Sequence, residues 1–347
     1  MANQKLLDAI TAAEAALADI RRMASDEPLP PAAPVTAAMI NARLGVGISL
    51  GTALEAPREG DWGVTLEPDD FRRIAAAGFR HVRLPARTSA HAGTRAPYTI
   101  EQGWLDRLNW CLDMAEANGL VTIFDPVHHY DEIYEDARGH RERFKAMWSQ
   151  LANLIARRSP EKIVVELLNE MRKSASGDML NQLLADGVAA VRPTNPDKAI
   201  MIGCETNNSM AIPSGFNPPR DPLLILSCHC YTDSDAWTGA FTHQGVMGNP
   251  VTGAWKTKDK GKAWITRWMD VAQSWAKGRG MPVNMGEFGC SVHCPEADRL
   301  EYIGFVNGEA AKRGWSRTLW DSHSNTFGLR KKGQDFPEGV RRAVGLV

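Results

Sequence analysis

The sequence predicts an α/β fold in which eight parallel strands close into a (β/α)8 barrel, preceded by an N-terminal helical extension. Three observations support this prediction. Eight short apolar segments alternate with amphipathic ones, the chain of 347 residues is long enough for one large barrel, and polar residues follow the apolar segments at one end. An open doubly wound sheet usually has fewer strands, so the closed barrel is favoured.

The apolar segments are interpreted as buried strands because they are short, rich in β-branched residues or leucine, and bounded by turn residues. They cover residues 44–50, 81–84, 120–124, 163–168, 199–203, 223–227, 282–285 and 317–319. The clearest helices between them lie around residues 144–155 and 264–275, where apolar residues recur every three or four positions.

Two segments precede the first strand. Residues 4–23 carry apolar side chains at helical spacing, and residues 27–35 are rich in proline, which is typical of a stiff, extended connector. We therefore divide the chain into an N-terminal helix and connector, 1–34, and a catalytic barrel, 35–347. A helix that packs on the outside of the barrel is favoured over a separate interaction module.

Composition excludes several partners. The formal net charge is -1, so a nucleic acid or an anionic membrane surface is not expected, and a neutral substrate fits better. No apolar run has the length of a membrane span, and no signal peptide is visible at the N-terminus. We expect a monomer that is either cytoplasmic or the mature form of a secreted protein.

The six cysteines are too few and too scattered for a disulfide framework in a chain of this length. Cys228 and Cys230, or Cys290 and Cys294 with His293, could be drawn as a zinc site, but neither pair has the usual C-x2-C spacing. Buried thiols are the favoured interpretation. A disulfide between Cys290 and Cys294 is left open.

Polar side chains lie at or just after the ends of the predicted strands, most clearly in IVVELLNE, 163–170, which we expect to end in Asn169 and Glu170. The full set is Arg83, His128, His129, Asn169, Glu170, His229, Tyr231, Glu287 and Trp320. The carboxyl ends of barrel strands meet at one mouth, so these side chains are expected to converge.

Two carboxylates without a glycine-rich phosphate loop favour acid/base and nucleophilic chemistry on a neutral polymer. Glycoside hydrolysis requires such a pair. An adjacent Arg83 would keep one carboxylate ionised, whereas burial would keep the proton on the other.

The motifs that carry these residues resemble those of glycoside hydrolase family 5, the cellulase family, over residues 42–347. They are GTALEAPREGDWG at 51–63, HVRLP at 81–85, HHY at 128–130, LNE at 168–170, HCY at 229–231, FTHQG at 241–245, GEFG at 286–289 and Trp320. The resemblance implies a TIM barrel and a retaining, endo-acting hydrolase of β-1,4-linked polysaccharides or oligosaccharides, with no cofactor and no catalytic metal.

The resemblance also implies individual roles. Glu170 would be the general acid/base and Glu287 the nucleophile, with Arg83 and Tyr231 beside Glu287 and His229 beside Glu170. The expected substrate contacts are those of Glu55, His128, His129 and Asn169 with sugar hydroxyls, of Trp320 with a pyranose face, and of His243, Trp237, Trp255 and Phe327 at neighbouring subsites.

The chain departs from the family pattern at Thr52, Thr88 and Met171, where the family commonly has Asn, Trp and Pro, and its loop after Tyr231 is longer. These departures bear on substrate preference more than on mechanism. Other polar residues are given structural roles: Glu166 is expected in the barrel wall, and His81 is expected to face the helical layer.

The predicted activity is hydrolysis of internal β-1,4-glucosidic bonds in cellulose-like or mixed-linkage glucans by double displacement. The alternative with the same catalysts is an endo-β-1,4-mannanase or glucomannan-active enzyme, and a non-catalytic glycan-binding barrel is the alternative of another class. A metallohydrolase built on His128, His129, Glu170 and His229 is disfavoured, because these histidines lack a helical H-x3-H pair and Arg83 would compete with the metal.

Overall fold

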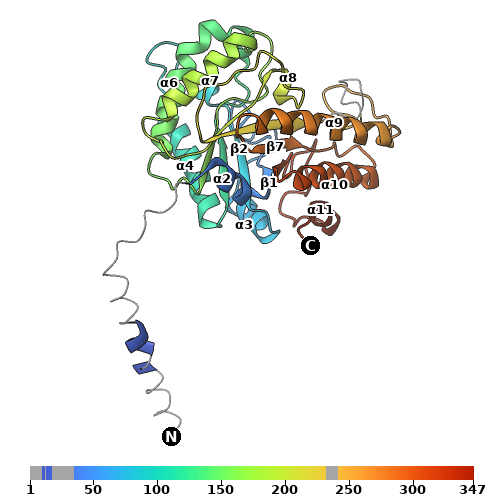
Figure 1. The fold of residues 1–347 in the computed structure, drawn as a ribbon. Helices are drawn as coiled ribbons and strands as arrows, with labels where there is room; N and C mark the ends of the chain where they lie inside the picture. Colours follow the sequence, from blue (N-terminus) through green and yellow to red (C-terminus); the bar gives the residue numbers. More distant parts are fainter. Residues whose placement is uncertain (1–9, 12, 18–34, 232–240) are drawn as a thin grey trace. The chain divides into compact units, whose positions relative to one another are not determined.

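Eight short strands pair in sequence order into a closed, all-parallel barrel with helices around its outside (Figure 1). The computed structural model describes residues 10, 11, 13–17, 35–231 and 241–347. The strands are β1 (Val46–Ser49), β2 (His81–Pro85), β3 (Val121–Asp125), β4 (Ile163–Glu166), β5 (Ile200–Ile202), β6 (Leu224–Cys230), β7 (Val283–Phe288) and β8 (Ser316–Leu319). The predicted (β/α)8 barrel and its eight strands are confirmed.

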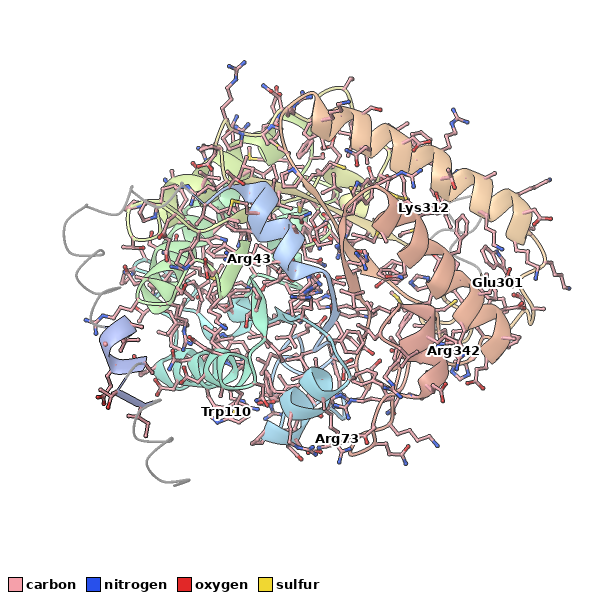
Figure 2. The ribbon with its side chains drawn as sticks, turned by 60° about the horizontal axis from the view of Figure 1, so that its bottom comes forward. Arg43, Arg73, Trp110, Glu301, Lys312 and Arg342 are labelled. Atoms are coloured by element: carbon pink, nitrogen blue, oxygen red, sulfur yellow. The ribbon has the colours of Figure 1, made fainter. Side chains whose placement is uncertain are left out.

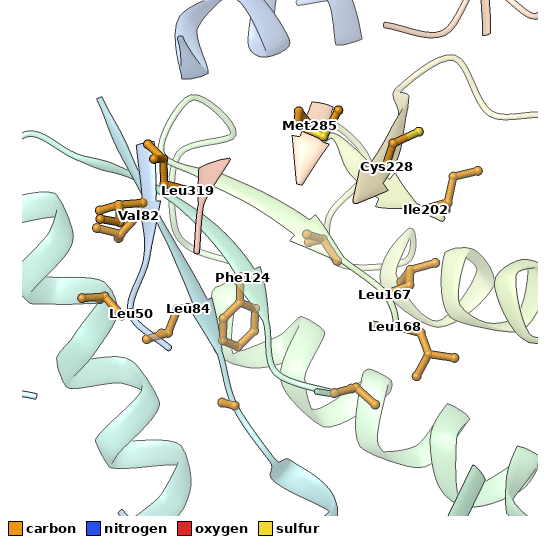
Figure 3. Packing of buried hydrophobic residues seen from close by; sticks show 14 of the residues in the cluster. Leu50, Val82, Leu84, Phe124, Leu167, Leu168, Ile202, Cys228, Met285 and Leu319 are labelled. Carbon is orange, nitrogen blue, oxygen red and sulfur yellow. The ribbon is translucent and has the colours of Figure 1, made fainter. Parts of the chain in front are cut away.

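Apart from α2 (Ala37–Leu44), which precedes β1, the helices of the barrel domain follow the strands, and the longer helices bury an apolar face. The helices after α2 are α3 (Pro68–Ala76), α4 (Gln102–Ala117), α5 (Asp131–Glu135), α6 (Ala137–Ile155), α7 (Gly177–Val191), α8 (Glu205–Asn208), α9 (Lys258–Lys277), α10 (Glu296–Lys312) and α11 (Glu338–Ala343). The two helices predicted at 144–155 and 264–275 are confirmed within α6 and α9. Leu84, Phe124 and Leu319 on the strands belong to the buried hydrophobic cluster, part of which Figure 3 shows.

The N-terminal extension and the barrel are separate compact units, Met1–Val35 and Thr36–Val347. The described residues of the extension, 10, 11 and 13–17, are helical and exposed, within the segment predicted as a helix. Its predicted packing on the barrel and the proposed domain boundary stay predictions. Among the described residues, no helix has both the length and the apolar character to cross a membrane.

All six cysteines are buried. The Sγ atoms of Cys290 and Cys294 lie 3.7 Å apart, which is longer than the S–S bond of a disulfide.

The inward face of the strands is unusually polar, and His81 belongs to it. Alternate strand residues share a face, and Arg83 points into the barrel, so His81 does too. Its Nδ1 lies 2.8 Å from the Leu44 carbonyl oxygen and its Nε2 lies 2.8 Å from Oγ1 of Thr318. Burial lowers the pKa of His81 to about 4, so the ring is neutral. The prediction that His81 faces the helical layer is therefore wrong.

Helix α2 closes the amino-terminal end of the barrel. Asn41 on this helix donates from Nδ2 to the Val283 carbonyl oxygen at 3.0 Å and accepts from Ser316 Oγ at 2.6 Å. Asn284 donates to the same Ser316 hydroxyl at 2.6 Å. Figure 2 shows α2, which carries Arg43, near the centre of the view from this side. With this end closed, the opposite end is left as the mouth.

A bulge in β7 turns Glu287 into the barrel. Strands β6 and β7 pair Cys228 with Met285 but His229 with Glu287, so Gly286 is an extra residue on one side of the ladder. Without it, the alternation from inward-facing Asn284 would point Glu287 toward the helices. A Cβ at Gly286 would lie 2.3 Å from Ser227 Oγ and 3.1 Å from His229 Nε2, which explains the glycine.

We predict that Gly286→Ala lowers the free energy of unfolding by about 1–3 kcal/mol, because the added methyl group overpacks the barrel interior. Urea unfolding measures the change. The matched control is Gly308→Ala in α10, where nothing lies within 4 Å of the added Cβ. That control should gain up to about 1 kcal/mol from helix propensity; equal effects in the two variants would contradict the overpacking argument.

Candidate active site

A cavity of about 530 Å³ opens at the carboxyl ends of the strands. Its lining comprises His128, His129, Tyr134, Asn169, Glu170, Arg172, Asn207, Ser209, His229, Tyr231, His243, Val246, Met247, Asn249, Glu287, Trp320 and Phe327. The structure thus brings ten of the fourteen site residues predicted from the sequence to one cavity. Two others, Arg83 and Glu55, lie behind its wall, and the last two are Trp255 and Trp237.

Arg83 is buried beneath the cavity floor and contacts three carboxyl groups. Its Nε donates to Glu166 Oε2 at 2.7 Å, its Nη1 to Glu287 Oε1 at 2.5 Å, and its Nη2 lies 2.8 Å from Asp125 Oδ2. The same Nη2 also donates to Asn169 Oδ1 at 2.8 Å. The expected placement of Glu166 in the barrel wall agrees with these contacts, and Arg83 itself has no surface for a substrate to touch.

Glu287 is almost fully enclosed, with 6% of its side chain exposed. Besides Arg83, it accepts a hydrogen bond from the Tyr231 hydroxyl at 2.8 Å. Burial raises the pKa of Glu287 to about 7, reinforced by the charge of Glu170 and opposed by His229, Arg83 and Tyr231. One oxygen therefore faces Arg83 and the other faces the tyrosine.

Glu170 is more open, with 24% of its side chain exposed to the cavity. Strand β4 ends at Glu166, two residues before the end predicted at 168, and Glu170 has a left-handed backbone with φ of 46°. Its Oε1 lies 3.0 Å from Nδ1 of His229. Burial raises the pKa of Glu170, and the positive charges of Arg172 and Arg83 offset part of that rise.

The two cavity carboxyl groups are neighbours. One side-chain oxygen of Glu170, one of Glu287 and a ring nitrogen of His229 all lie within 4.8 Å of one another. Retaining glycosidases have carboxyl groups roughly 5 Å apart, and inverting ones need a wider gap for water. The spacing here is of the retaining kind.

Glu55 does not reach the cavity, contrary to the expected substrate contact. Only 1% of it is exposed, and its Oε1 lies 3.1 Å from His128 Nε2 and 3.4 Å from His129 Nε2. Its other oxygen accepts from the Thr52 amide. Burial acts to lower the pKa of His129, but the hydrogen bond and charge of Glu55 outweigh burial and raise it. Glu55 therefore influences the cavity through the two histidines.

His128 is held from three sides. Its Nδ1 lies 2.6 Å from Asp125 Oδ2, and its Nε2 lies 3.2 Å from the Asn169 amide nitrogen as well as near Glu55. Burial lowers the pKa of His128 well below its usual value, so the ring is neutral. The indole ring of Trp320 is nearly parallel to the His128 imidazole, with 5.9 Å between centroids.

The three departures from the family pattern occupy different places. The Thr52 hydroxyl donates to Asp321 Oδ2 at 2.9 Å, in the residue that follows Trp320. Thr88 is buried and accepts from the Trp104 indole nitrogen at 3.1 Å. Met171 is buried behind Glu170, and its carbonyl oxygen accepts from the Asn207 amide at 3.2 Å. None of the three is among the residues that line the cavity.

The remaining wall is aromatic. His243 and Phe327 pack edge-on at 5.2 Å between centroids, and both contact the Tyr231 ring. Trp255, expected at a subsite, is instead buried against Phe241, with 5.5 Å between centroids, because its loop folds back onto α10. Trp237 and the longer loop after Tyr231 fall mostly in 232–240, outside the described residues.

Seven lining residues were not predicted: Tyr134, Arg172, Asn207, Ser209, Val246, Met247 and Asn249. A usable signal existed for two of them, because TNNS at 206–209 follows the fifth predicted strand. Asparagine tolerates the left-handed backbone that such a sharp turn requires. Arg172 lies two residues past Glu170, and its Nη1 donates to the Glu170 carbonyl oxygen at 3.0 Å.

Within the described part of the chain, two groups of three residues have donor atoms close enough to hold a cation: Glu55 with His128 and His129, and Glu170 with His229 and Glu287. The four residues of the disfavoured metallohydrolase are divided between these trios. Arg83 already places a positive charge on Glu287, which opposes a metal in the second trio.

Comparisons with known proteins support the family resemblance. Residues 48–326 match the family model described as "Cellulase (glycosyl hydrolase family 5)". The chain is 31% identical over 280 residues to Endoglucanase H of Acetivibrio thermocellus, covering 81% of this chain but only 30% of that protein. It is 26% identical over 340 residues to Endoglucanase A of Paenibacillus barcinonensis, covering 84% of each.

Solved structures show the same likeness. A hyperthermophilic endo-β-1,4-glucanase in complex with substrate superposes with a TM-score of 0.84 at 29% identity, covering 90% of this chain and 100% of that one. Cel5A of Thermotoga maritima in complex with mannotriose gives a TM-score of 0.82 at 30% identity, covering 88% and 99%.

The raised pKa of Glu287 predicts a pH-dependent stability. Between about pH 4 and pH 7 the folded protein retains on the Glu170–Glu287 pair a proton that the unfolded chain loses, so the pair destabilises the fold progressively as pH rises. The stability of Glu287→Gln relative to the wild type should therefore increase as pH rises through this range, by roughly 2–3 kcal/mol in total. Above pH 7 the difference should stay constant.

Urea unfolding at pH 5 and pH 8 measures that gain. Glu161→Gln, which removes a half-exposed carboxylate paired with Arg43, is the control for loss of a surface charge. A stability difference for Glu287→Gln that is constant or falls with pH would contradict the assignment.

Proposed function

The chain belongs to glycosyl hydrolase family 5, the cellulase family, and we propose that it hydrolyses internal β-1,4-glucosidic bonds of cellulose-like or mixed-linkage glucans with net retention. The observation that carries the proposal is the pair of buried carboxyl groups, Glu170 and Glu287, within 4.8 Å of each other in different surroundings. The family and the endoglucanase relatives support the substrate class.

In the first step a Glu287 oxygen would attack the anomeric carbon while Glu170 gives its proton to the departing glycosidic oxygen. The carbon–oxygen bond to the leaving sugar breaks, and a glycosyl ester forms on Glu287. In the second step Glu170, now ionised, takes a proton from water, whose oxygen attacks the same carbon and releases Glu287. Two inversions give net retention.

The surroundings of the two carboxyl groups support these roles. Glu287 accepts charge-assisted hydrogen bonds from Arg83 at 2.5 Å and a hydrogen bond from Tyr231 at 2.8 Å, both of which favour its ionised form. Glu170 has no arginine hydrogen bond to its carboxyl group among the described contacts and is more exposed to the cavity. When the pair holds one proton, that proton therefore belongs on Glu170, the acid.

Other residues would bind the sugar. Asn169 is fixed by Arg83 and His128 and lines the cavity, where its amide would face the 2-hydroxyl. Trp320 offers an aromatic face for a pyranose ring. His128, His129 and His243 supply donors and acceptors for hydroxyl groups, which suits a neutral saccharide.

Mannan or glucomannan is the second candidate substrate. One specific observation favours it: a structural relative at 30% identity was solved with mannotriose, and with cellobiose in another structure. A non-catalytic glycan-binding barrel is disfavoured because both carboxyl groups are present and close together. Action as a monomer stays a prediction.

The first test is reducing-sugar release from soluble cellulose, barley β-glucan, mannan, glucomannan and xylan, with Glu287→Gln as control. We expect release from the glucans and a loss of at least about a hundredfold in the variant, the lower range for losing an essential catalytic group. Release mainly from mannan would select the second candidate, and no release from any polymer would refute hydrolysis. Proton NMR of the first product should show the β-anomer; the α-anomer would refute retention.

Tyr231→Phe should shift the acidic limb of the kcat/KM profile to higher pH, by up to about one unit. The hydroxyl hydrogen bond lowers the pKa of Glu287, against the dominant effect of burial, so its removal raises the pH at which the nucleophile ionises. Tyr98→Phe, outside the cavity lining, is the matched control. An unmoved limb, or one displaced to lower pH, would contradict this role.

A further inference from the structure

The turn after β5 has a strained backbone. Three consecutive residues, Thr206, Asn207 and Asn208, have left-handed φ angles of 65°, 59° and 53°. Residues other than glycine adopt this region at a cost, asparagine at the smallest cost. Such an outlier calls for a function that the turn performs.

The turn places the side-chain amide of Asn208 inside the barrel mouth. Asn208 is fully buried, and its Nδ2 lies 3.2 Å from Nε2 of His229. A Cβ at Gly203 would lie 2.3 Å from Asn208 Oδ1, so the amide occupies space that only a glycine leaves. The backbone N–H of Asn207 also donates to the Met171 carbonyl oxygen at 3.2 Å, so this turn is hydrogen-bonded to the loop that carries Glu170.

His229 links Asn208 to the acid/base. Its Nε2 faces Asn208, and its Nδ1 faces Glu170 Oε1 at 3.0 Å, with Glu287 Oε2 at 3.7 Å. Burial lowers the pKa of His229, so the ring is neutral and carries a single proton on one of its two nitrogens. The partner of Nε2 then decides which nitrogen carries it.

We propose that Asn208 is a positioning residue that donates from Nδ2 to His229 Nε2 and thereby keeps the ring proton on Nδ1, facing Glu170. The inference rests on the proposed function, in which Glu170 is the acid/base. With Nδ1 always a donor, Oε1 of Glu170 is an acceptor. The acid proton of Glu170 must then sit on Oε2, the oxygen left free for the substrate.

The opposite tautomer would divert the acid proton. A ring protonated on Nε2 presents the Nδ1 lone pair to Glu170, which would then donate its proton to the histidine rather than to the glycosidic oxygen. The first step needs that proton most, because the leaving sugar alkoxide is a strong base. A leaving group that is already a weak base would need it little.

Asn208→Asp is the sharpest variant because aspartate keeps the size and the left-handed tolerance of asparagine but only accepts hydrogen bonds when ionised. It therefore draws a proton onto Nε2. Either Nδ1 becomes an acceptor, or the ring becomes an imidazolium that has taken the proton of Glu170. Both outcomes deprive the leaving group of its acid.

The other charged and titratable groups around Glu170 are the same in the wild type and in Asn208→Asp. They are Arg83, Asp125, His129, Tyr134, Arg172, His229, Tyr231, His243 and Glu287. Because the added aspartate also changes the local charge, the test relies on a ratio between two substrates in the same enzyme rather than on one pH profile.

We expect Asn208→Asp to lower kcat/KM for a cello-oligosaccharide by at least about tenfold. For an aryl cellobioside with an activated, weakly basic phenol as leaving group, kcat/KM should change by less than about threefold. The matched control is Asn284→Asp, another buried barrel asparagine, which contacts Ser316 at the closed end. Its two rates should fall together. Equal losses on both substrates in Asn208→Asp would overturn the proposal.

A second measurement does not depend on turnover. In wild-type protein labelled with nitrogen-15 histidine, with His229 assigned by comparison with His229→Asn, the Nδ1 signal should be of the protonated type and Nε2 of the unprotonated type. The reverse pattern would overturn the proposal even in an active enzyme. The expected pattern in an inactive protein would instead refute the proposed function while leaving the tautomer assignment standing.

Discussion

A single buried guanidinium holds the mouth of this barrel together. Arg83 contacts Asp125, Glu166 and Glu287 within 2.8 Å and also fixes Asn169. These partners come from β3, β4, β7 and the loop after β4, so one side chain sets the relative positions of four parts of the chain. Removing one partner from a buried ion pair typically costs 3–5 kcal/mol of stability, and Arg83 takes part in three such pairs. The cavity can be rigid because its floor is ionic rather than apolar.

Irregularities in the backbone also orient side chains toward the cavity. A regular β7 would point Glu287 away from the cavity, and the extra residue Gly286 reverses that direction. Glu170 and Asn208 both have left-handed backbones just beyond strands that end early. Regular strands therefore bring the chain to the mouth, and departures from regularity aim the side chains. Strain of this kind is concentrated where groups must be held at defined positions.

The sequence predicted the barrel because hydrophobic periodicity identifies strands and helices directly, and it predicted the convergence of Glu170, His229 and Glu287 because strand ends share one mouth. It failed where direction or depth mattered. His81 was placed on the wrong face of its strand and Glu55 in contact with the substrate, because neighbouring residues in the sequence do not reveal which side chains a buried polar network encloses. Asn208 was missed because its role depends on a turn conformation and on a glycine five residues earlier, neither of which periodicity records.

The protonation states of the carboxyl groups at the barrel mouth follow from an imbalance of charge. Arg83 contacts three buried carboxyl groups, those of Asp125, Glu166 and Glu287, and burial raises the pKa of both Asp125 and Glu287 to about 7. One guanidinium does not offset the burial of three carboxylates in a poorly solvated site, so protons are retained there near neutral pH. The hydrogen bonds of Arg83 and Tyr231 favour ionisation at Glu287, which leaves a retained proton for Glu170. The shortage of positive charge is thus what allows one residue to attack while its neighbour still holds a proton to give.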